Sequence, residues 1–334
     1  FDVNVPVGVL AVLLAAFVQK EWKNQTRSPF DWQGFAAIVL FMPLAIYALA
    51  RGNSPSNPGG WSAPEVIGCF IVAGAALAWF IVAELRNPAP LLQIRLLAER
   101  NFGISMAVLT LFAIGMLGGT YLLPLYMQRG LGYTALAAGS MFLPVGVIQG
   151  VLSAVSGYLT RYVRPLLLSA AGILIMALSF WLASRFTLHT THGHILFILY
   201  LRGFGMGLTF APLNLFSLKN LTQQDMAAAA GISNSIKQLA GSIGIALLTV
   251  IFSARTSYHA AHETVSAAQT YVEGVTDALR VVAVITLAAL LPLLGVFRKK
   301  RPGKSGVKGA ATPSPGEAVS GKTDKTTIYR TKPE

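Results

Sequence analysis

Two basic residues lie inside stretches of sequence that are otherwise apolar and uncharged. Arg202 lies in the segment LYLRGFGMGLTFAPLN, and Lys237 lies in ISNSIKQLAGSIGIALL. Both stretches are long enough to cross a bilayer as a helix, where a cation costs roughly 3 kcal/mol, so each residue is a candidate for function. The alternative is that both side chains reach the interface or bond neighbouring carbonyls, and only orient their helices.

The acidic and histidine side chains do not form a recognisable proton-carrying or metal-binding site. No Asp or Glu lies deep in any predicted span, and Asp31 and Glu84 lie at span boundaries. A proton pump or symporter usually needs a buried carboxylate. His189, His192 and His194 lie close together, but their spacing matches no standard zinc site, so we expect no metal. Without a Ser/His/Asp set or a carboxylate pair in the apolar stretches, the sequence argues against an enzyme.

The composition places the chain in a membrane. Apolar residues make up 54% of it and charged residues 12%, about half of the roughly 25% that is typical of globular proteins. Eight stretches are long enough to span a bilayer as helices, and the opening stretch is a ninth, incomplete one. The eight are residues 32–50, 66–83, 102–128, 130–160, 165–184, 195–218, 231–254 and 281–297. We therefore expect an all-α integral membrane protein.

The Lys and Arg residues are unevenly distributed among the predicted loops. One set of alternate loops, together with the segment after the last span, holds most of them, which places that set in the cytoplasm. The first helix then runs inward and the C-terminus is cytoplasmic, in a bacterial-type inner or plasma membrane. Because the net charge of +13 lies between spans and in a basic tail, residues 298–334, we expect no nucleic-acid partner and a disordered tail.

The run GFGMG, with Gly203, Gly205 and Gly207, looks like a nucleotide-binding loop only superficially. It follows no predicted strand, and Arg202 and the flanking apolar spans contradict a dinucleotide-binding unit. Small residues let helix backbones approach closely within a membrane. We therefore expect these glycines to pack helices.

Six motifs, in order along the chain, resemble those of the fourteen-span drug/proton antiporters of the major facilitator superfamily. They are FDVNVPVG, FDWQG, YLLPLYMQRGLGYTALAAGSMFLPVG, GYLTRYVRP, LRGFGMGLTFAPL and NSIKQLAGSIGIALL. The third is the most specific, and is similar to the family's helix nine to ten hairpin almost residue for residue. Two positions depart from the family's pattern: Thr160 stands where an Asp is common, and Lys237 stands where an Arg is usual.

This resemblance, which covers Phe1 to about Phe297, implies the major facilitator superfamily fold. It divides the chain into helix six of the first bundle (residues 1–18), two inter-bundle helices with cytoplasmic connectors (19–101), a C-terminal six-helix bundle (102–297) and the tail. It also implies that the chain begins just before helix six. The first bundle, with the family's acidic proton-carrying residues, is then missing, and we expect this part alone not to transport.

The resemblance further implies roles for particular residues. Arg202, Lys237 and Gln238 are expected to serve a transport or proton network, with Arg202 stabilising the bundle and Lys237 anchoring one helix to another. The residues expected to touch cargo, with helix packing as the alternative for each, are Met116, Tyr121, Met206, Phe210 and Asn214. The expected cytoplasmic gating turn comprises Gly157, Arg161 and Arg164, and the expected packing glycines are Gly203, Gly205, Gly207, Gly241 and Gly244.

We therefore expect a secondary active transporter that exports drugs or other amphiphilic small molecules by alternating access. The proton gradient is the expected energy source, without any further cofactor. Two alternatives remain open: an exporter of one specific metabolite, and a transport-inactive half-transporter that acts as a membrane interaction subunit. The expected partners are a small-molecule substrate, the lipid bilayer, the missing N-terminal bundle and a periplasmic adaptor.

Overall fold

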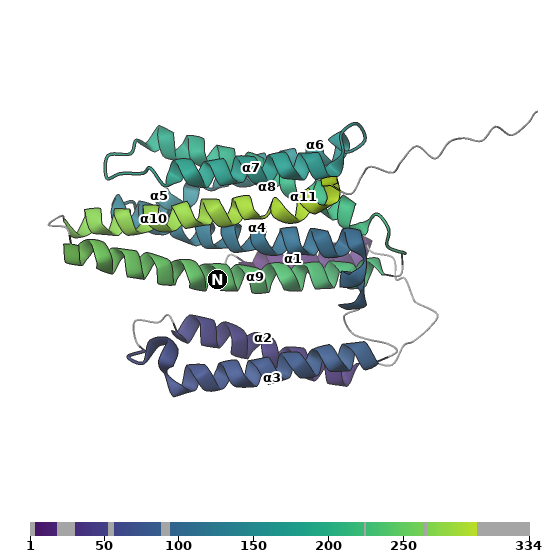
Figure 1. Cartoon of the computed structure of the whole chain (residues 1–334). Coiled ribbons are helices and arrows are strands. Elements are labelled where there is room, and N and C mark those ends of the chain that lie inside the picture. Colours follow the sequence, from purple (N-terminus) through teal and green to yellow (C-terminus); the bar gives the residue numbers. More distant parts are fainter. Residues whose placement is uncertain are drawn as a thin grey trace, which may run out of the picture.

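The computed structural model describes residues 4–18, 31–52, 57–87, 94–223, 225–262 and 266–298, and all regular structure within these ranges is helical (Figure 1). The α-helices are α1 (Asn4–Val18), α2 (Trp32–Gly52), α3 (Pro64–Arg86), α4 (Arg100–Leu125), α5 (Ala135–Ser140), α6 (Leu143–Leu159), α7 (Pro165–Ala183), α8 (His192–Leu218), α9 (Met226–His262), α10 (Ala267–Ala288) and α11 (Leu291–Arg298). Short turns add η1 (Gly60–Ser62), η2 (Ile94–Ala98) and η3 (Tyr126–Gly130), the last a π-helical extension of α4. The all-α class is thus confirmed.

Eight helical segments of the described chain are long and apolar enough to cross a membrane. Each of them overlaps one of the eight predicted spans, so the number of span-length apolar helices agrees with the prediction. The first helix, α1, has 15 residues and is shorter than any of the eight. The connector at residues 19–30 and the basic tail after Arg298 lie outside the described residues.

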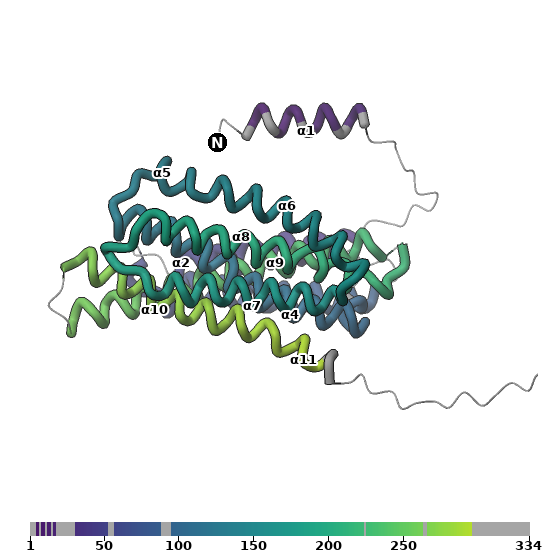
Figure 2. The backbone as a smooth tube through the Cα atoms, turned by 90° about the horizontal axis from the view of Figure 1, so that it is seen from above, coloured from purple at the N-terminus to yellow at the C-terminus, as the bar shows by residue number. Residues whose placement is uncertain are grey.

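Helices α4 to α11 pack into one bundle around a shared apolar core, and α2 and α3 form a hairpin beside it (Figure 1). Fully buried aromatic side chains in this core include Phe112 of α4 and Phe180 of α7. The hairpin touches the bundle where α2 meets α9. Figure 2 shows α1 apart from the bundle. Most of the buried core of the described chain therefore lies in the bundle.

Glycines set the spacing between α8 and its neighbours. A Cβ atom added at Gly205 would lie 2.8 Å from the backbone nitrogen of Met176, on α7, and one added at Gly172 would lie 2.8 Å from the carbonyl oxygen of Gly205. Gly203 and Gly207 likewise lie against the backbone of α6 and Gly244 against that of α4, whereas Gly241 faces the Leu117 side chain of α4. Backbones this close leave no room for a side chain, as is common between membrane helices.

The last two spans differ in extent from the prediction. The sequence predicts spans at residues 231–254 and 281–297 with a polar loop between them, whereas α9 continues to His262 and α10 begins at Ala267. The hydroxyl of Ser266 accepts a hydrogen bond from the backbone N–H of Gln269 and caps α10. Hydropathy falls after residue 254 while the helix continues, because residues 255–262 contain no Gly or Pro to interrupt it. Glu273 and Asp277 consequently lie inside a long helix instead of a loop.

Replacing Gly205 with Ala should lower the melting temperature of the purified protein. The new methyl group meets backbone atoms of α7, which cannot rotate away, so the two helices must separate. Overpacking of this kind costs about 1–3 kcal/mol. The measurement is thermal unfolding in detergent, followed by intrinsic fluorescence.

Gly150→Ala is the matched control, because a Cβ at this α6 position meets nothing within 4 Å. Its melting temperature should stay the same or rise. Equal losses in the two variants would contradict the role of close backbone approach between α7 and α8.

Candidate functional site

Arg202 lies in the middle of α8 and is buried, with 2% of its surface exposed. Its Nη2 atom donates hydrogen bonds to the carbonyl oxygen of Met116, at 3.2 Å, and to the hydroxyl of Thr120, both on α4. The guanidinium carbon lies 5.3 Å from the centre of the Phe180 ring on α7, within the range of a cation–π contact. One side chain therefore joins α8 to two other helices.

The charge of Arg202 is nevertheless incompletely satisfied. Within the described chain no acidic residue pairs with it, and its Nη1 atom is buried without a hydrogen-bond partner. Leaving such a donor unpaired costs about 1–3 kcal/mol. The Met116 carbonyl also accepts a hydrogen bond from the Thr120 hydroxyl, at 2.6 Å, so it keeps a partner without the guanidinium. This geometry favours a functional role for Arg202 over a purely structural one.

The five predicted cargo residues do not come together in one cavity of the described structure. Met116 is buried in the core, and Met206 and Phe210 of α8 pack against the same core. Asn214 is exposed on α8. Of the five, only Tyr121, with 39% of its surface exposed, lines a detected pocket.

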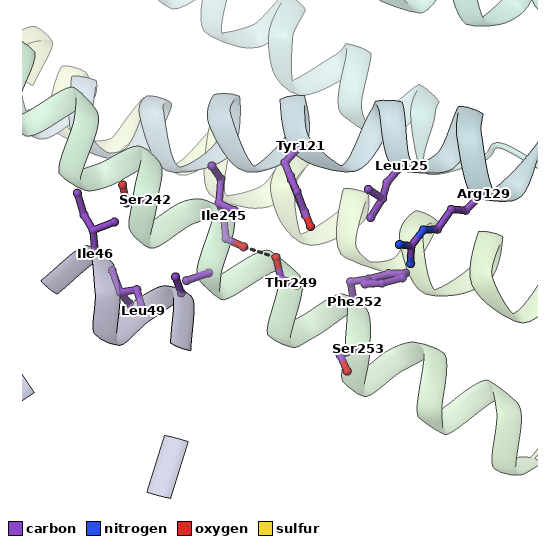
Figure 3. Close-up of a pocket in the computed structure, with 12 residues that line it drawn as sticks. Ile46, Leu49, Tyr121, Leu125, Arg129, Ser242, Ile245, Thr249, Phe252 and Ser253 are labelled. Atoms are coloured by element: carbon purple, nitrogen blue, oxygen red, sulfur yellow. Dashed lines mark hydrogen bonds between the residues drawn. The ribbon is translucent and has the colours of Figure 1, made fainter. Parts of the chain in front are cut away.

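That pocket lies between α2, α4 and α9 and has a volume of about 530 Å³ (Figure 3). Its apolar wall consists of Ile46, Leu49, Ala50, Leu125, Ile245, Ala246 and Phe252, and its polar lining of Tyr121, Arg129, Ser242, Thr249 and Ser253. The volume is within the range of small-molecule sites, and a mostly apolar wall with a few polar groups is their usual lining. The sequence did not predict this pocket, because α2 and α9 are far apart along the chain.

Arg129, in η3, is the one charged residue among those that line the pocket. Its side chain and the ring of Phe252 point toward each other at one end of the pocket (Figure 3). Within the described chain it forms no ion pair with an acid, and the buried hydroxyl of Tyr271 lies near its guanidinium. The pocket therefore combines an apolar body with a positively charged end.

The other residues of the predicted proton network lie on α9. Lys237 is half-buried and Gln238 is exposed, and neither contacts Arg202 through a hydrogen bond or ion pair within the described residues. The backbone carbonyl of Gln238 accepts a hydrogen bond from the Ser242 hydroxyl, at 3.0 Å. The structure does not bring these two side chains to Arg202, and their roles stay predictions.

The predicted gating turn lies between α6 and α7. Arg161 and Arg164 are exposed, and the guanidinium of Arg161 lies 5.3 Å from the centre of the Tyr158 ring. The Thr160 hydroxyl donates a hydrogen bond to the Gly157 carbonyl, at 2.6 Å. Thr160 thus closes the turn locally instead of offering a carboxylate to the two arginines.

The structure brings together two groups of acidic residues that the sequence did not single out as sites. At one end of the α2–α3 hairpin, Asp31 and Glu84 are both buried against Gly34, and Asp31 accepts a hydrogen bond from the Gly34 N–H at 2.9 Å. At the α9–α10 connection, Glu273 and Asp277 surround His259. The spacing of Glu273 and Asp277, four residues apart, places them on one helix face. The sequence shows this spacing, but it was not used as a sign of a shared helix face because residues 255–280 were predicted to form a loop.

The fold and this geometry define a multi-pass helical membrane protein whose bundle buries a cation. Residues 7–245 match the Major Facilitator Superfamily, and the chain belongs to that family. It is similar to the multidrug export protein EmrB of Escherichia coli K12, with 31% identity over 268 residues, which are 80% of this chain and 52% of EmrB.

Two further relatives have similar coverage. The uncharacterized MFS-type transporter YhcA of Bacillus subtilis is 29% identical over 255 residues, 76% of this chain and 47% of YhcA. The fatty acid resistance protein FarB of Neisseria gonorrhoeae is 28% identical over 261 residues, 78% of this chain and 51% of FarB. The chain thus spans about half the length of the curated relatives it matches.

Replacing Arg202 with Met should leave the melting temperature of the protein within about 2–4 °C of the wild type, the change that a modest interaction makes in a domain of this size. Met fills similar apolar space and removes a buried, partly unsatisfied charge, a change that is often neutral or stabilising. The measurement is thermal unfolding of the purified protein. A much larger loss would show that the guanidinium itself holds the bundle together.

Proposed function

We propose that this protein takes part in the secondary active export of amphiphilic small molecules by alternating access, coupled to protons. The observation that carries the proposal is the pocket between α2, α4 and α9, with its apolar wall and single cationic end. Membership of the Major Facilitator Superfamily supports transport, and the names of the multidrug export protein EmrB and the fatty acid resistance protein FarB describe export or resistance for those two proteins.

The charge of the pocket narrows the class of cargo. Because Arg129 is the one charged residue in the lining, a cationic amphiphile is repelled at that end, whereas an anionic or neutral one is not. Arg also binds carboxylates through paired hydrogen bonds. We therefore favour amphiphiles with an anionic or hydrogen-bond-accepting head over the apolar cations that the sequence also admits.

Arg202 belongs to the transport or proton network in this proposal. Its unpaired Nη1 and its bonds to α4 make it a charge that can change partners when α4 and α8 move relative to each other. Alternating access depends on such movements of packed helices. Lys237 and Gln238 lie on α9, which packs against α4, and are proposed to support the same network.

The proposal also covers the setting of the protein. The distribution of Lys and Arg supports a cytoplasmic C-terminus in an inner or plasma membrane. An N-terminal bundle, such as the family resemblance implies, is the proposed partner for alternating access. A periplasmic adaptor is a further proposed partner.

In the complete transporter, Arg202→Met should abolish efflux while expression and melting temperature stay near those of the wild type. The reason is that the substitution removes the mobile charge and preserves packing. The measurement is efflux of a fluorescent amphiphile from cells with equal amounts of transporter in their membranes. Efflux at the wild-type rate would remove Arg202 from the proposed network.

Arg129→Gln should raise the half-saturating concentration of an anionic amphiphile several-fold, because a charge-assisted contact with its head group is lost. Export of a cationic dye should be unchanged or improved. Both are measured as initial transport rates in everted membrane vesicles.

Arg185→Gln is the control, because Arg185 is exposed just after α7, at the same end of the bundle, and does not line the pocket. It should leave both transport rates unchanged. Equal effects of the two substitutions on the anionic cargo would point to general surface charge instead of the pocket.

A further inference from the structure

Three titratable side chains meet near the connection between α9 and α10, and none of them lines the pocket or bonds to Arg202. They are His259 of α9 and Glu273 and Asp277 of α10, and we call them the hairpin triad. Their side chains are largely buried, with 15%, 30% and 16% of their surfaces exposed, respectively. They are therefore partly withdrawn from solvent because they lie between two long helices.

The imidazole of His259 lies between the two carboxylates. Its Nε2 atom is 3.1 Å from Oδ2 of Asp277, a hydrogen-bond distance, and its Nδ1 atom is 3.5 Å from Oε2 of Glu273. Each ring nitrogen thus faces a different acid. The two acids are four residues apart on α10, so a single side chain of α9 connects with two successive turns of the neighbouring helix.

The two carboxylates differ in their other partners. Asp277 also pairs with Arg280, at 2.8 Å, and with Arg255, at 3.7 Å. Oε1 of Glu273 accepts a hydrogen bond from the amide of Gln269 at 3.0 Å, but its Oε2 atom is buried without a hydrogen-bond partner. The oxygen that lacks a donor is therefore the one that faces Nδ1 of His259.

The protonation state of the imidazole decides whether both carboxylates can accept a hydrogen bond from it. A neutral imidazole carries one N–H group and can donate to only one carboxylate, whereas the protonated ring carries two. We propose that the hairpin triad is a proton-binding site: a proton from solvent binds the unprotonated nitrogen of the neutral ring, and the resulting cation links Glu273 and Asp277 and clamps α9 to α10.

Among the described residues, the other charged and titratable groups nearby do not supply a hydrogen bond to Oε2 of Glu273. On α9, His262 stacks on the ring of Tyr258, with ring centres 4.4 Å apart, and Arg255 pairs with Asp277. From the elements packed against this hairpin, η3 contributes Arg129, which lies by Tyr271 of α10, and α4 contributes Tyr121. The remaining groups are Arg280 of α10, which pairs with Asp277, and Tyr47 and Arg51 of α2, the latter paired with Glu65 at 2.8 Å; α7 contains no titratable residue.

The sign of the pH dependence follows from this geometry. The clamp is complete when the ring is charged, so its contribution to stability is present at low pH and is lost as the pH rises. Imidazole in general titrates at a pH of about 6.5, within the range that cells and their surroundings reach. In the topology proposed above, this end of the bundle faces outward, toward the compartment that supplies protons to an exporter. Only this last point rests on the proposed function.

The test is thermal unfolding of the purified full chain at pH 6 and pH 8.5. The difference in Tm between the wild type and His259→Gln should be larger at pH 6 than at pH 8.5 by about 2–4 °C, the shift that one modest interaction makes in a domain of this size. Glu273→Gln should remove the same pH-dependent component. If His259→Gln fails to fold, Glu273→Gln alone supplies the comparison.

Two further variants make the result specific. His262→Gln changes an exposed histidine one turn away on α9 and should leave the pH-dependent component in place. His259→Lys carries a charge at both pH values and should keep stability at pH 8.5 while losing the pH dependence. A Tm difference that does not change with pH, or one that His262→Gln removes equally, would overturn the proposal. Because unfolding requires no transport, this outcome is independent of whether the protein exports amphiphiles.

Discussion

The close approach of α8 to its neighbours constrains much of the bundle. Gly205 and Gly172 let the backbones of α7 and α8 meet, and Gly203 and Gly207 do the same between α8 and α6. In an apolar solvent, helices gain little from burying apolar surface, so backbone contacts at small residues contribute much of their association. This packing positions Arg202 so that it reaches Met116 and Thr120 on α4 and the Phe180 ring on α7.

Another side of α4 packs against α9, with Gly244 close to the α4 backbone. There, α4 faces α9 and the more distant α2, and the space between them forms the pocket that Tyr121, Arg129 and Phe252 line (Figure 3). Arg202 and the apolar pocket thus lie at different faces of α4, and both faces are closely packed against a neighbouring helix. Movement of α4 relative to its neighbours would affect both faces at once, so in the proposed transport cycle α4 links the pocket to Arg202.

Much of this organisation could be predicted from the sequence. Apolar stretches fixed the number and place of the eight spans because a bilayer requires about 20 apolar residues per helix. The glycines of GFGMG were expected at close helix contacts because residues without a side chain let helix backbones approach each other within a membrane. Arg202 stood out because a charge in an apolar span is costly and therefore rare.

Other features could not be predicted because they depend on the extent of helices and on distant contacts. Hydropathy ended the predicted span at residue 254, so the sequence assigned His259, Glu273 and Asp277 to a loop. In the structure His259 lies in α9, and Glu273 and Asp277 lie in α10. The pocket joins residues of α2, α4 and α9 that no local pattern connects. The burial of Met116, and the separation of Lys237 from Arg202, likewise follow from helix rotation, which one sequence leaves undetermined.

Proton-driven transport by the complete protein is the central claim of this account, and one measurement addresses it directly. Everted vesicles with the complete transporter are energised, and uptake of a fluorescent anionic amphiphile is followed before and after a protonophore is added. We expect uptake well above that of vesicles without the transporter, and its collapse when the proton gradient is dissipated. Uptake no greater than in vesicles without the transporter, or uptake that the protonophore leaves unchanged, would contradict the account.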